Sequence, residues 1–228
     1  MRPRVLVSWS SGKDSAWMLH TLQQRDDIDL AGLLTTVNET FGRVSMHAVR
    51  RELLAAQADA AGLPLLEIPL PWPCSNEEYE RRMSAAVAAA RADDVTHVAF
   101  GDMFLEDVRA YRERQMVGTG LSPLFPLWAR DTAQLAREMI ASGLRARLTA
   151  VDRAVLPASF AGREFDASLL DDLPPGVDPC GEYGEFHSFC YDGPMFRRRI
   201  HFEPGDIVQR NGFAFADLLH NTAASAPS

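Results

Sequence analysis

A short segment near the N-terminus, SWSSGKDS (residues 8–15), combines hydroxyl groups, a glycine and the only lysine of the chain. Of the 23 lysine and arginine residues, one is Lys13 and the other 22 are arginine. A lysine ammonium is a compact point charge that a planar guanidinium does not imitate. Hydroxyls and a flexible glycine backbone can donate hydrogen bonds to an oxyanion. This segment, the serine loop, therefore predicts a phosphate site made by Ser8, Ser10, Ser11, Gly12, Lys13, Asp14 and Ser15.

An ordinary helix start is the alternative interpretation of the serine loop, with Ser11 or Asp14 as the N-cap and Lys13 in solvent. The loop is not a Walker loop, because Val7 stands where that motif needs glycine and Asp14 where it needs Ser or Thr. Its position directly after a buried strand favours phosphate, since ligands of parallel sheets bind at the carboxyl ends of strands.

A second chemically dense stretch is DPCGEYGEFHSFCYDGPMF (residues 178–196), the acidic segment. Glu182, Glu185 and His187 lie within six residues of one another. Two carboxylates and an imidazole can bind a cation, hold an amine or transfer protons. The alternative is a surface turn with solvated carboxylates. The glycines of the segment and its lack of helical or strand periodicity favour a shaped loop.

The first half of the chain alternates apolar runs with amphipathic helical patterns. Strands are predicted at residues 4–9, 30–37, 63–70 and 96–101, and helices at 14–24, 46–61, around 79–90, and at 104–117. His47 would open the second helix, on the ligand edge of the sheet. Strands that alternate with helices of this length indicate βαβ units and a parallel sheet.

The pattern changes after Leu121, where prolines become frequent. A helix is predicted at 131–142, a strand at 144–152, a short helix at 166–172, and short strands at 198–202 and 206–210. We therefore expect an α/β protein. A doubly wound, Rossmann-like, parallel five-stranded sheet would form an ATP-binding domain over residues 1–120, and a smaller α+β domain over 121–228 would carry the acidic segment.

Further ligand contacts are expected where the predicted strands end. Adenine would contact the backbone near Thr35 and Thr36, after the second strand. Asp102, after the fourth strand, could hold a metal ion or the ribose, or simply form a turn. Arg112 and Arg114 could reach phosphate or cover a solvent-facing helix surface.

Composition narrows the class of protein. The 228 residues carry a net charge of −8 and 46% hydrophobic residues. An acidic chain is a poor match for extended nucleic-acid binding. No apolar run approaches the roughly 20 residues that cross a bilayer, and a strand begins too early for a signal peptide. Three cysteines (Cys74, Cys180 and Cys190) without a CxxC pair favour structural thiols and a cytoplasmic location.

The serine loop resembles a known phosphate motif. SSGKDS (10–15) is similar to the PP-loop of the N-type ATP pyrophosphatases, whose usual form is Ser-Gly-Gly-x-Asp-Ser. The chain departs from that form at Ser11, where the family most often has glycine. Such enzymes cleave ATP between the α- and β-phosphates and release pyrophosphate.

The acidic segment resembles the DPCGExGEFHT…DGPxF signature of the diphthine–ammonia ligase family, with Ser188 in place of the usual threonine. Further matches are GD at 101–102, YRER at 111–114, PLW at 126–128 and QADAAGLPL at 57–65. The resemblance covers nearly the whole chain up to Phe196.

The resemblance implies an ATP-dependent amidation with ATP and Mg²⁺ as cofactors. A carboxylate would attack the α-phosphate, and ammonia would displace AMP from the acyl-adenylate. The acceptor would be diphthine, a modified histidine on an elongation factor, or a small molecule. Lys13 would serve the phosphates, and Asp14 would cap the helix or orient Lys13. Asp14 and Asp102 could also contact a metal ion. Glu182, Glu185 and His187 would form the ammonium and acyl-adenylate pocket.

Two other functions stay open at this point. A PP-loop enzyme that modifies RNA, by thiolation or lysidine formation, would need a basic surface, and thiolation usually needs paired cysteines. A non-catalytic ATP-binding module would leave the acidic segment without a role. The sequence does not decide whether the chain forms a homo-oligomer.

Overall fold

The computed structural model describes residues 2–40, 43–44 and 49–221. Its larger sheet contains five parallel strands in the order β4–β2–β1–β5–β6. Their bounds are β1 Arg4–Ser8, β2 Asp29–Asn38, β4 Leu65–Leu70, β5 His97–Ala99 and β6 Ser122–Leu124, and a two-residue strand, β3 Arg43–Val44, pairs antiparallel with the end of β2. The predicted doubly wound, five-stranded parallel sheet is confirmed.

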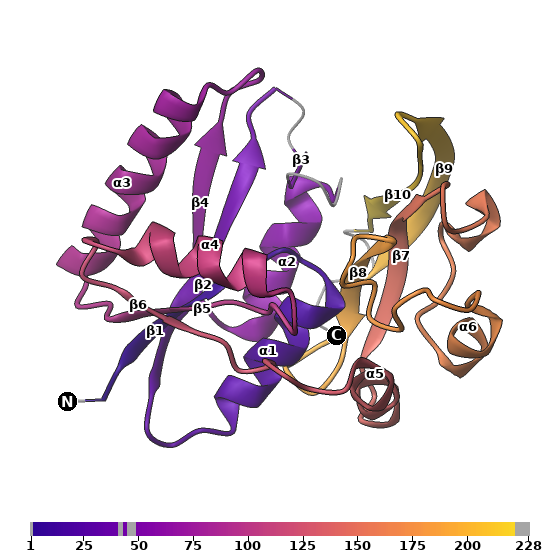
Figure 1. Cartoon of the computed structure of the whole chain (residues 1–228), viewed down its shortest axis with the longest axis horizontal. Coiled ribbons are helices and arrows are strands. Elements are labelled where there is room, and N and C mark those ends of the chain that lie inside the picture. The colour runs from indigo at the N-terminus through magenta and orange to yellow at the C-terminus, as the bar shows by residue number, and fades with distance from the viewer. Residues whose placement is uncertain (1, 41–42, 45–48, 222–228) are drawn as a thin grey trace.

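Helices cover both faces of this sheet (Figure 1). They are α1 Lys13–Gln23, α2 Arg51–Ala61, α3 Asn76–Ala92 and α4 Glu106–Met116. The alternation of side chains along β1 separates two cores: Val5 and Val7 join the core with α1 and α2, whereas Leu6 joins the core of α3 and α4. Successive strand residues therefore face opposite helical layers, as a doubly wound fold requires.

Helix boundaries follow local chemistry. Gly62 ends α2 in the left-handed conformation, with φ at 68°, and Ser75 caps α3 by accepting a hydrogen bond from the Glu78 N–H at 3.2 Å. In the structure α2 begins at Arg51. The residues at which the sequence predicts its start, His47 among them, lie outside the described residues.

The second half forms a separate antiparallel sheet in the order β8–β7–β10–β9. Its strands are β7 Arg145–Asp152, β8 Phe186–Asp192, β9 Phe202–Arg210 and β10 Phe213–His220, accompanied by α5 Thr132–Ala141, a 3₁₀ turn at Ala158–Phe160 and α6 Ala167–Asp172. One continuous hydrophobic core joins this sheet to α1 and α2, so the two sheets do not stand apart. The smaller α+β part is confirmed.

Several sequence-based expectations for this half are wrong in detail. The acidic segment contains a regular strand, β8, where a loop was predicted. Its residues are buried on both faces, which removes the alternation that identifies strands. Residues 198–201 form no strand, and β9 begins only at Phe202. Neither β6 nor β10 was among the strands predicted by residue range.

No helix within the described ranges is long and apolar enough to cross a membrane.

The three cysteines are unpaired thiols, as predicted.

Candidate active site

The serine loop lies where β1 ends and α1 begins, at the carboxyl edge of the parallel sheet. Its hydroxyls form a small internal network. Ser15 Oγ donates to the Gly12 carbonyl at 3.0 Å, and Ser10 Oγ lies 3.2 Å from Ser15 Oγ. The Gly12 N–H donates to Ser10 Oγ at 3.3 Å. These internal hydrogen bonds are weak. A bound anion could take their place by accepting hydrogen bonds from the Gly12 N–H and from the hydroxyls of Ser10 and Ser15, which already lie close together.

Ser11 has the backbone conformation that the related motif assigns to glycine. Its φ is 71°, in the left-handed region that residues with a Cβ rarely adopt. The side chain is fully buried, and its hydroxyl has no hydrogen-bond partner among the described residues. The departure from Ser-Gly-Gly-x-Asp-Ser is thus accommodated at the cost of local strain.

Lys13 is buried, with only 1% of its surface exposed, so the solvated alternative is wrong. Its ammonium lies 2.9 Å from both carboxylate oxygens of Asp14 and also donates to the Cys180 carbonyl. The rings of Phe165 and Phe186 lie 5.4 and 5.1 Å from it. Burial alone would lower the pKa of Lys13, but Asp14, Cys180 and Glu182 together outweigh burial and raise this pKa, which keeps the ammonium charged.

The N-cap of α1 is Gly12, so neither Ser11 nor Asp14 caps this helix. Asp14 instead orients Lys13, one of the two roles predicted for it. The contact of Lys13 with phosphate stays a prediction, since its ammonium is held here by Asp14 and Cys180.

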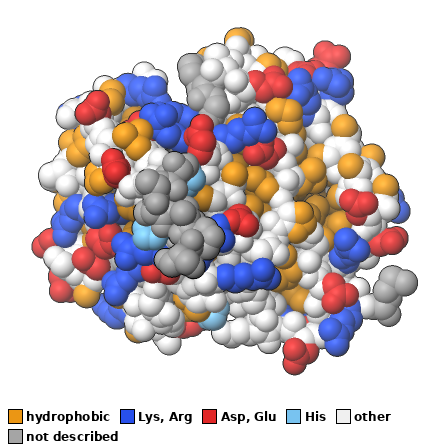
Figure 2. Space-filling view, turned by 180° about the vertical axis from the view of Figure 1, so that it is seen from behind, with side chains coloured by type: hydrophobic (Ala, Val, Ile, Leu, Met, Phe, Trp, Pro, Cys, Tyr) orange, Lys and Arg blue, Asp and Glu red, His pale blue; other side chains and the backbone are white. Residues whose placement is uncertain are grey.

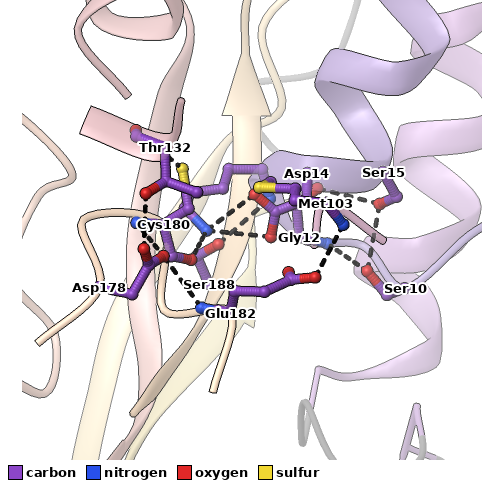
Figure 3. Close-up of polar contacts among 11 residues, drawn as sticks. Ser10, Gly12, Asp14, Ser15, Met103, Thr132, Asp178, Cys180, Glu182 and Ser188 are labelled. Carbon is purple, nitrogen blue, oxygen red and sulfur yellow. Dashed lines mark hydrogen bonds and ion pairs between the residues drawn. The ribbon is translucent and has the colours of Figure 1, made fainter. Parts of the chain in front are cut away.

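Residues 178–185, the acidic turn, are organised by one carboxylate. Asp178 Oδ1 accepts hydrogen bonds from the N–H groups of Cys180 at 2.9 Å and Glu182 at 3.2 Å. Its Oδ2 accepts from Thr132 Oγ at 2.6 Å, which fixes the turn to the start of α5. Figure 3 shows these residues facing the serine loop across a narrow gap.

Glu182 connects the acidic turn to the parallel sheet. Its Oε1 accepts a hydrogen bond from the Met103 N–H, just after β5, at 2.8 Å. Burial, reinforced by the carboxylates of Asp14 and Asp102, raises the pKa of Glu182 to about 7, although the hydrogen bond from Met103 opposes this shift. Both protonation states are therefore accessible near neutral pH, as a group that exchanges protons requires.

Glu185 and His187 take different positions. Glu185 is buried, its Oε1 accepts from the Asp178 N–H at 2.9 Å, and its Oε2 has no hydrogen-bond partner among the described residues. His187 lies on β8, where burial and then the charge of Lys13 lower the pKa of its imidazole to about 4. The imidazole is thus neutral at pH 7.

Asp102 follows β5 and lies beside the serine loop. The preceding Gly101 lies against the start of α1, where an added Cβ would be in ordinary contact with the Asp14 carbonyl carbon at 3.5 Å. Asp102 Oδ2 is buried, 3.6 Å from Arg112 Nε, too far for a hydrogen bond. Burial raises the pKa of Asp102 against the opposing effect of Arg112. Arg112 also lies over Phe100, and Arg114 is exposed.

A cavity of about 710 Å³ lies on the face of the sheet covered by α3 and α4. Its wall includes Ser8 and Ser10 of the serine loop, Thr35 and Thr36 of β2, and Tyr79. Apolar residues form most of the remaining wall: Leu6, Leu34, Met83, Val87, Val98, Phe100 and Met116. Its volume lies within the roughly 300–1,000 Å³ typical of small-molecule sites. The predicted contacts at Ser8, Ser10 and Thr35 thus share one cavity.

A divalent cation would have few protein ligands here. No group of three or more His, Cys, Asp or Glu side chains within the described ranges is arranged to hold a metal ion. Mg²⁺, however, is usually bound by one or two carboxylates together with substrate phosphates. Asp14 and the buried, incompletely paired Asp102 fit such a site.

Sequence reasoning missed the roles of four residues at this site. Phe165 and Phe186 contact the Lys13 ammonium, and Ser188 Oγ accepts the Lys13 N–H at 3.1 Å. Gln57 contacts the serine loop from α2. Two of them had a usable signal: Ser188 occupies the hydroxyl position of the signature, and Gln57 is a single amide within the apolar helical pattern LLAAQADAA.

Comparison with known families covers both halves of the chain. Residues 3–123 match the family described as Diphthamide synthase N-terminal domain, and residues 131–218 match the Diphthamide synthase C-terminal domain. The resemblance predicted from the serine loop and the acidic segment is confirmed.

Curated relatives agree over almost the full length. The diphthine–ammonia ligases of Mus musculus and Homo sapiens are 27% and 28% identical to this chain over 238 residues, with 95% of the chain and 89% of each relative covered. That of Danio rerio is 29% identical over 235 residues, with 94% and 92% covered. The chain is therefore an enzyme of the diphthamide synthase family.

Proposed function

We propose that this enzyme is an ATP-dependent amide-forming ligase that activates a carboxylate as its adenylate and couples it to ammonia. One observation carries the proposal: the serine loop and the acidic turn face each other, joined by the hydrogen bond from Lys13 to Cys180, and Glu182 ties the same turn to Met103 after β5 (Figure 3). Groups that could donate to phosphate and a carboxylate that could exchange protons thus lie near one another, which supports the proposal. The names of the curated relatives, diphthine–ammonia ligases, agree with this chemistry.

We propose that ATP lies with its base and ribose in the 710 Å³ cavity, near Thr35, and its phosphates along the serine loop. The backbone of Gly12 and the hydroxyls of Ser10 and Ser15 would bind the phosphates at the N-terminus of α1. Bound Mg²⁺, held by Asp14 and Asp102, would supply positive charge beside the phosphates. On this division, residues 1–120 bind ATP and residues 121–228 contribute the acidic turn.

The reaction balances as two displacements. An acceptor carboxylate oxygen bonds to the α-phosphorus, and the bond from that phosphorus to the oxygen bridging the β-phosphate breaks, which releases pyrophosphate. Ammonia nitrogen then bonds to the acyl carbon as AMP leaves, and one proton is lost to give the amide. Preorganised donors around the phosphates would stabilise the charge that develops on them.

Glu182 would accept protons from ammonium and from the attacking nitrogen. Its raised pKa of about 7 suits a group that gains and loses a proton near neutral pH. Glu185 would hold the acidic turn in shape through the Asp178 N–H. His187, neutral at pH 7, would face the acyl group as a hydrogen-bonding partner.

The test is product analysis with ATP, ¹⁵N-ammonium and a diphthine-bearing acceptor protein. The proposal predicts AMP and pyrophosphate in equal amounts, together with a ¹⁵N-labelled amide, and no labelled amide without ATP. Formation of ADP and phosphate, or AMP release unaffected by ammonium with no labelled product, would contradict it. A small-molecule extract as the acceptor would separate a wrong acceptor from a wrong reaction.

The RNA-modifying alternative has less support. On the face shown in Figure 2, acidic and basic side chains are interspersed, without the continuous basic band that RNA binding favours. Of the three cysteines, Cys180 and Cys190 are buried thiols with pKa values raised by burial, so neither is a ready nucleophile for thiolation.

A further inference from the structure

Gln57 is a buried amide in an otherwise apolar helix face. It is 0% exposed, and the buried neighbours on α2 include Leu53, Leu54 and Ala58. Burial of an amide is costly unless its hydrogen bonds are made within the protein. The partners of Gln57 therefore indicate why the amide is present.

All the partners of Gln57 belong to the serine loop region or to β8. Gln57 Nε2 donates to the Ser11 carbonyl at 2.9 Å and to the Cys190 carbonyl at 2.6 Å. Its Oε1 accepts from Trp9 Nε1 at 2.9 Å. The Ser11 carbonyl also accepts the Cys190 N–H at 2.9 Å. Two donors, one from α2 and one from β8, thus hold a single carbonyl of the serine loop.

The position of that carbonyl decides the direction of the next N–H. A peptide unit is planar and trans, so the Ser11 C=O and the Gly12 N–H point in opposite directions. A carbonyl held toward Gln57 and Cys190 therefore turns the Gly12 N–H toward Ser10 Oγ, on the proposed phosphate side. Ser11 keeps a left-handed φ of 71° to do this, a strained conformation that needs support from its surroundings.

We propose that Gln57 is the positioning residue of the phosphate-binding loop: it fixes the Ser11–Gly12 peptide so that the Gly12 N–H faces the nucleotide, and it ties that peptide to β8. This inference rests on the proposed binding of ATP at the serine loop. Gln57 acts through Ser11 and makes no contact with the nucleotide.

The test compares two substitutions by isothermal titration with ATP and Mg²⁺ in the full chain. Gln57→Met keeps the size of the side chain but removes both donors, so we expect the Kd for ATP to rise about tenfold relative to wild type at every pH. Gln57→Glu places a carboxylate against two carbonyl oxygens. Once protonated, that carboxyl can again donate a hydrogen bond to one of these carbonyl oxygens. The Kd of Gln57→Glu for ATP, divided by the wild-type Kd, should therefore fall as the pH is lowered from 8 to 6.

A matched control is Leu54→Ala, on the same helix and fully buried. It should lower the Tm at least as much as Gln57→Met while leaving the Kd for ATP unchanged. The inference is overturned if Gln57→Met binds ATP within twofold of wild type, or if Leu54→Ala weakens binding equally. Should Gln57→Met fail to fold, the pH profile of Gln57→Glu decides, and a flat ratio overturns the inference. Absence of ATP binding by wild type would instead overturn the proposed function together with this inference.

Discussion

The two faces of the parallel sheet differ in how closely their helices pack. On one face, α1 and α2 bury most of their inward residues, among them Trp17, Met18 and Leu54. On the other face, α3 buries only Ala90. The structure describes every residue of α4, and none of these residues is buried. The loosely packed face contains the 710 Å³ cavity.

This difference separates two tasks. The closely packed face holds the serine loop and joins it to the antiparallel sheet, because its core continues into β7 and β8. The open face leaves room for a ligand of nucleoside size, since α3 and α4 stand over the sheet without filling the space. A binding site benefits from this arrangement, in which a rigid layer positions the donors and a looser layer admits the ligand.

The largest expected effect comes from Lys13→Met, which breaks the link between the packed face and the acidic turn. The substitution leaves the Asp14 carboxylate without its partner, and Asp14 retains 30% side-chain exposure. We expect a loss of about 3 kcal/mol of unfolding free energy, at the low end for a broken buried pair, and a fall in pyrophosphate release of at least ~100-fold. Urea denaturation and a pyrophosphate assay measure the two effects.

Lys13→Arg is the matched variant, because it keeps the charge but not the shape. Lys13 is only 1% exposed and packs against the rings of Phe165 and Phe186, so a larger, planar guanidinium would need these groups to move. Full activity in Lys13→Arg would show that any cation suffices and would contradict this account of the only lysine.

Two truncations, one on each face of the sheet, test this difference in packing. Leu54→Ala, on the packed face, should cost about 2.5 kcal/mol of stability and leave ATP affinity unchanged. Met83→Ala, on α3 at the cavity wall, should cost less than about 1 kcal/mol because Met83 is only partly buried, yet it should weaken ATP binding by about threefold. Thermal unfolding and titration with ATP separate the two results, and equal stability losses would remove the distinction between the faces.

Glu182→Gln tests the carboxylate that joins the two halves. The pKa of Glu182 is raised from 4.5 to about 7, so the folded protein binds this proton more tightly than the unfolded chain. Its contribution to stability is complete below pH 4.5 and is lost as the pH rises through 7. The unfolding free energy of the glutamine variant, relative to that of wild type, should therefore increase by up to about 2 kcal/mol as the pH rises from 4.5 to 7. Above pH 7, the difference between the two unfolding free energies should stay constant.

The same substitution should lower the rate of ammonia-dependent amide formation. It should also remove the increase in this rate that wild type is expected to show as the pH rises through 7. Glu77→Gln, at an exposed position on α3, is the control and should change neither profile. An unchanged pH–rate profile in Glu182→Gln would exclude Glu182 as the proton acceptor.

Ser11→Gly gives the smallest expected effect. Glycine adopts a φ of 71° without strain, so the variant should be more stable by up to about 1 kcal/mol and should bind ATP within twofold of wild type. Ser11→Ala keeps the strain and removes only the unpaired hydroxyl, so any gain in its unfolding free energy measures the cost of burying that hydroxyl, and the further gain of Ser11→Gly measures the strain. Destabilisation by Ser11→Gly, measured by urea denaturation, would mean that the buried hydroxyl makes a contact that the structure does not show.

The sequence predicts much of the parallel half because its signals are local. Buried strands such as Arg4–Ser8 alternate with amphipathic helices, and the serine loop follows the first strand directly. β8 escaped prediction because burial on both faces hides strand periodicity, and β10 because it depends on pairing with β7 and β9.

The site shows the same limit. Residue types alone pointed to Lys13 and Glu182, but the cage of Phe165 and Phe186 around the ammonium depends on residues more than 150 positions away in the chain. The pairing of Glu182 with Met103 likewise arises from tertiary contact. Periodicity describes local structure and carries no information about such contacts.

The most direct test of the account is a crystal structure of the enzyme with Mg²⁺ and α,β-methylene-ATP, which cannot be cleaved at the α–β bond. We expect the base and ribose in the cavity under α3 and α4, and the α-phosphate between the serine loop and Glu182. A nucleotide bound elsewhere, with the serine loop keeping its internal Ser10 and Ser15 hydrogen bonds, would contradict it.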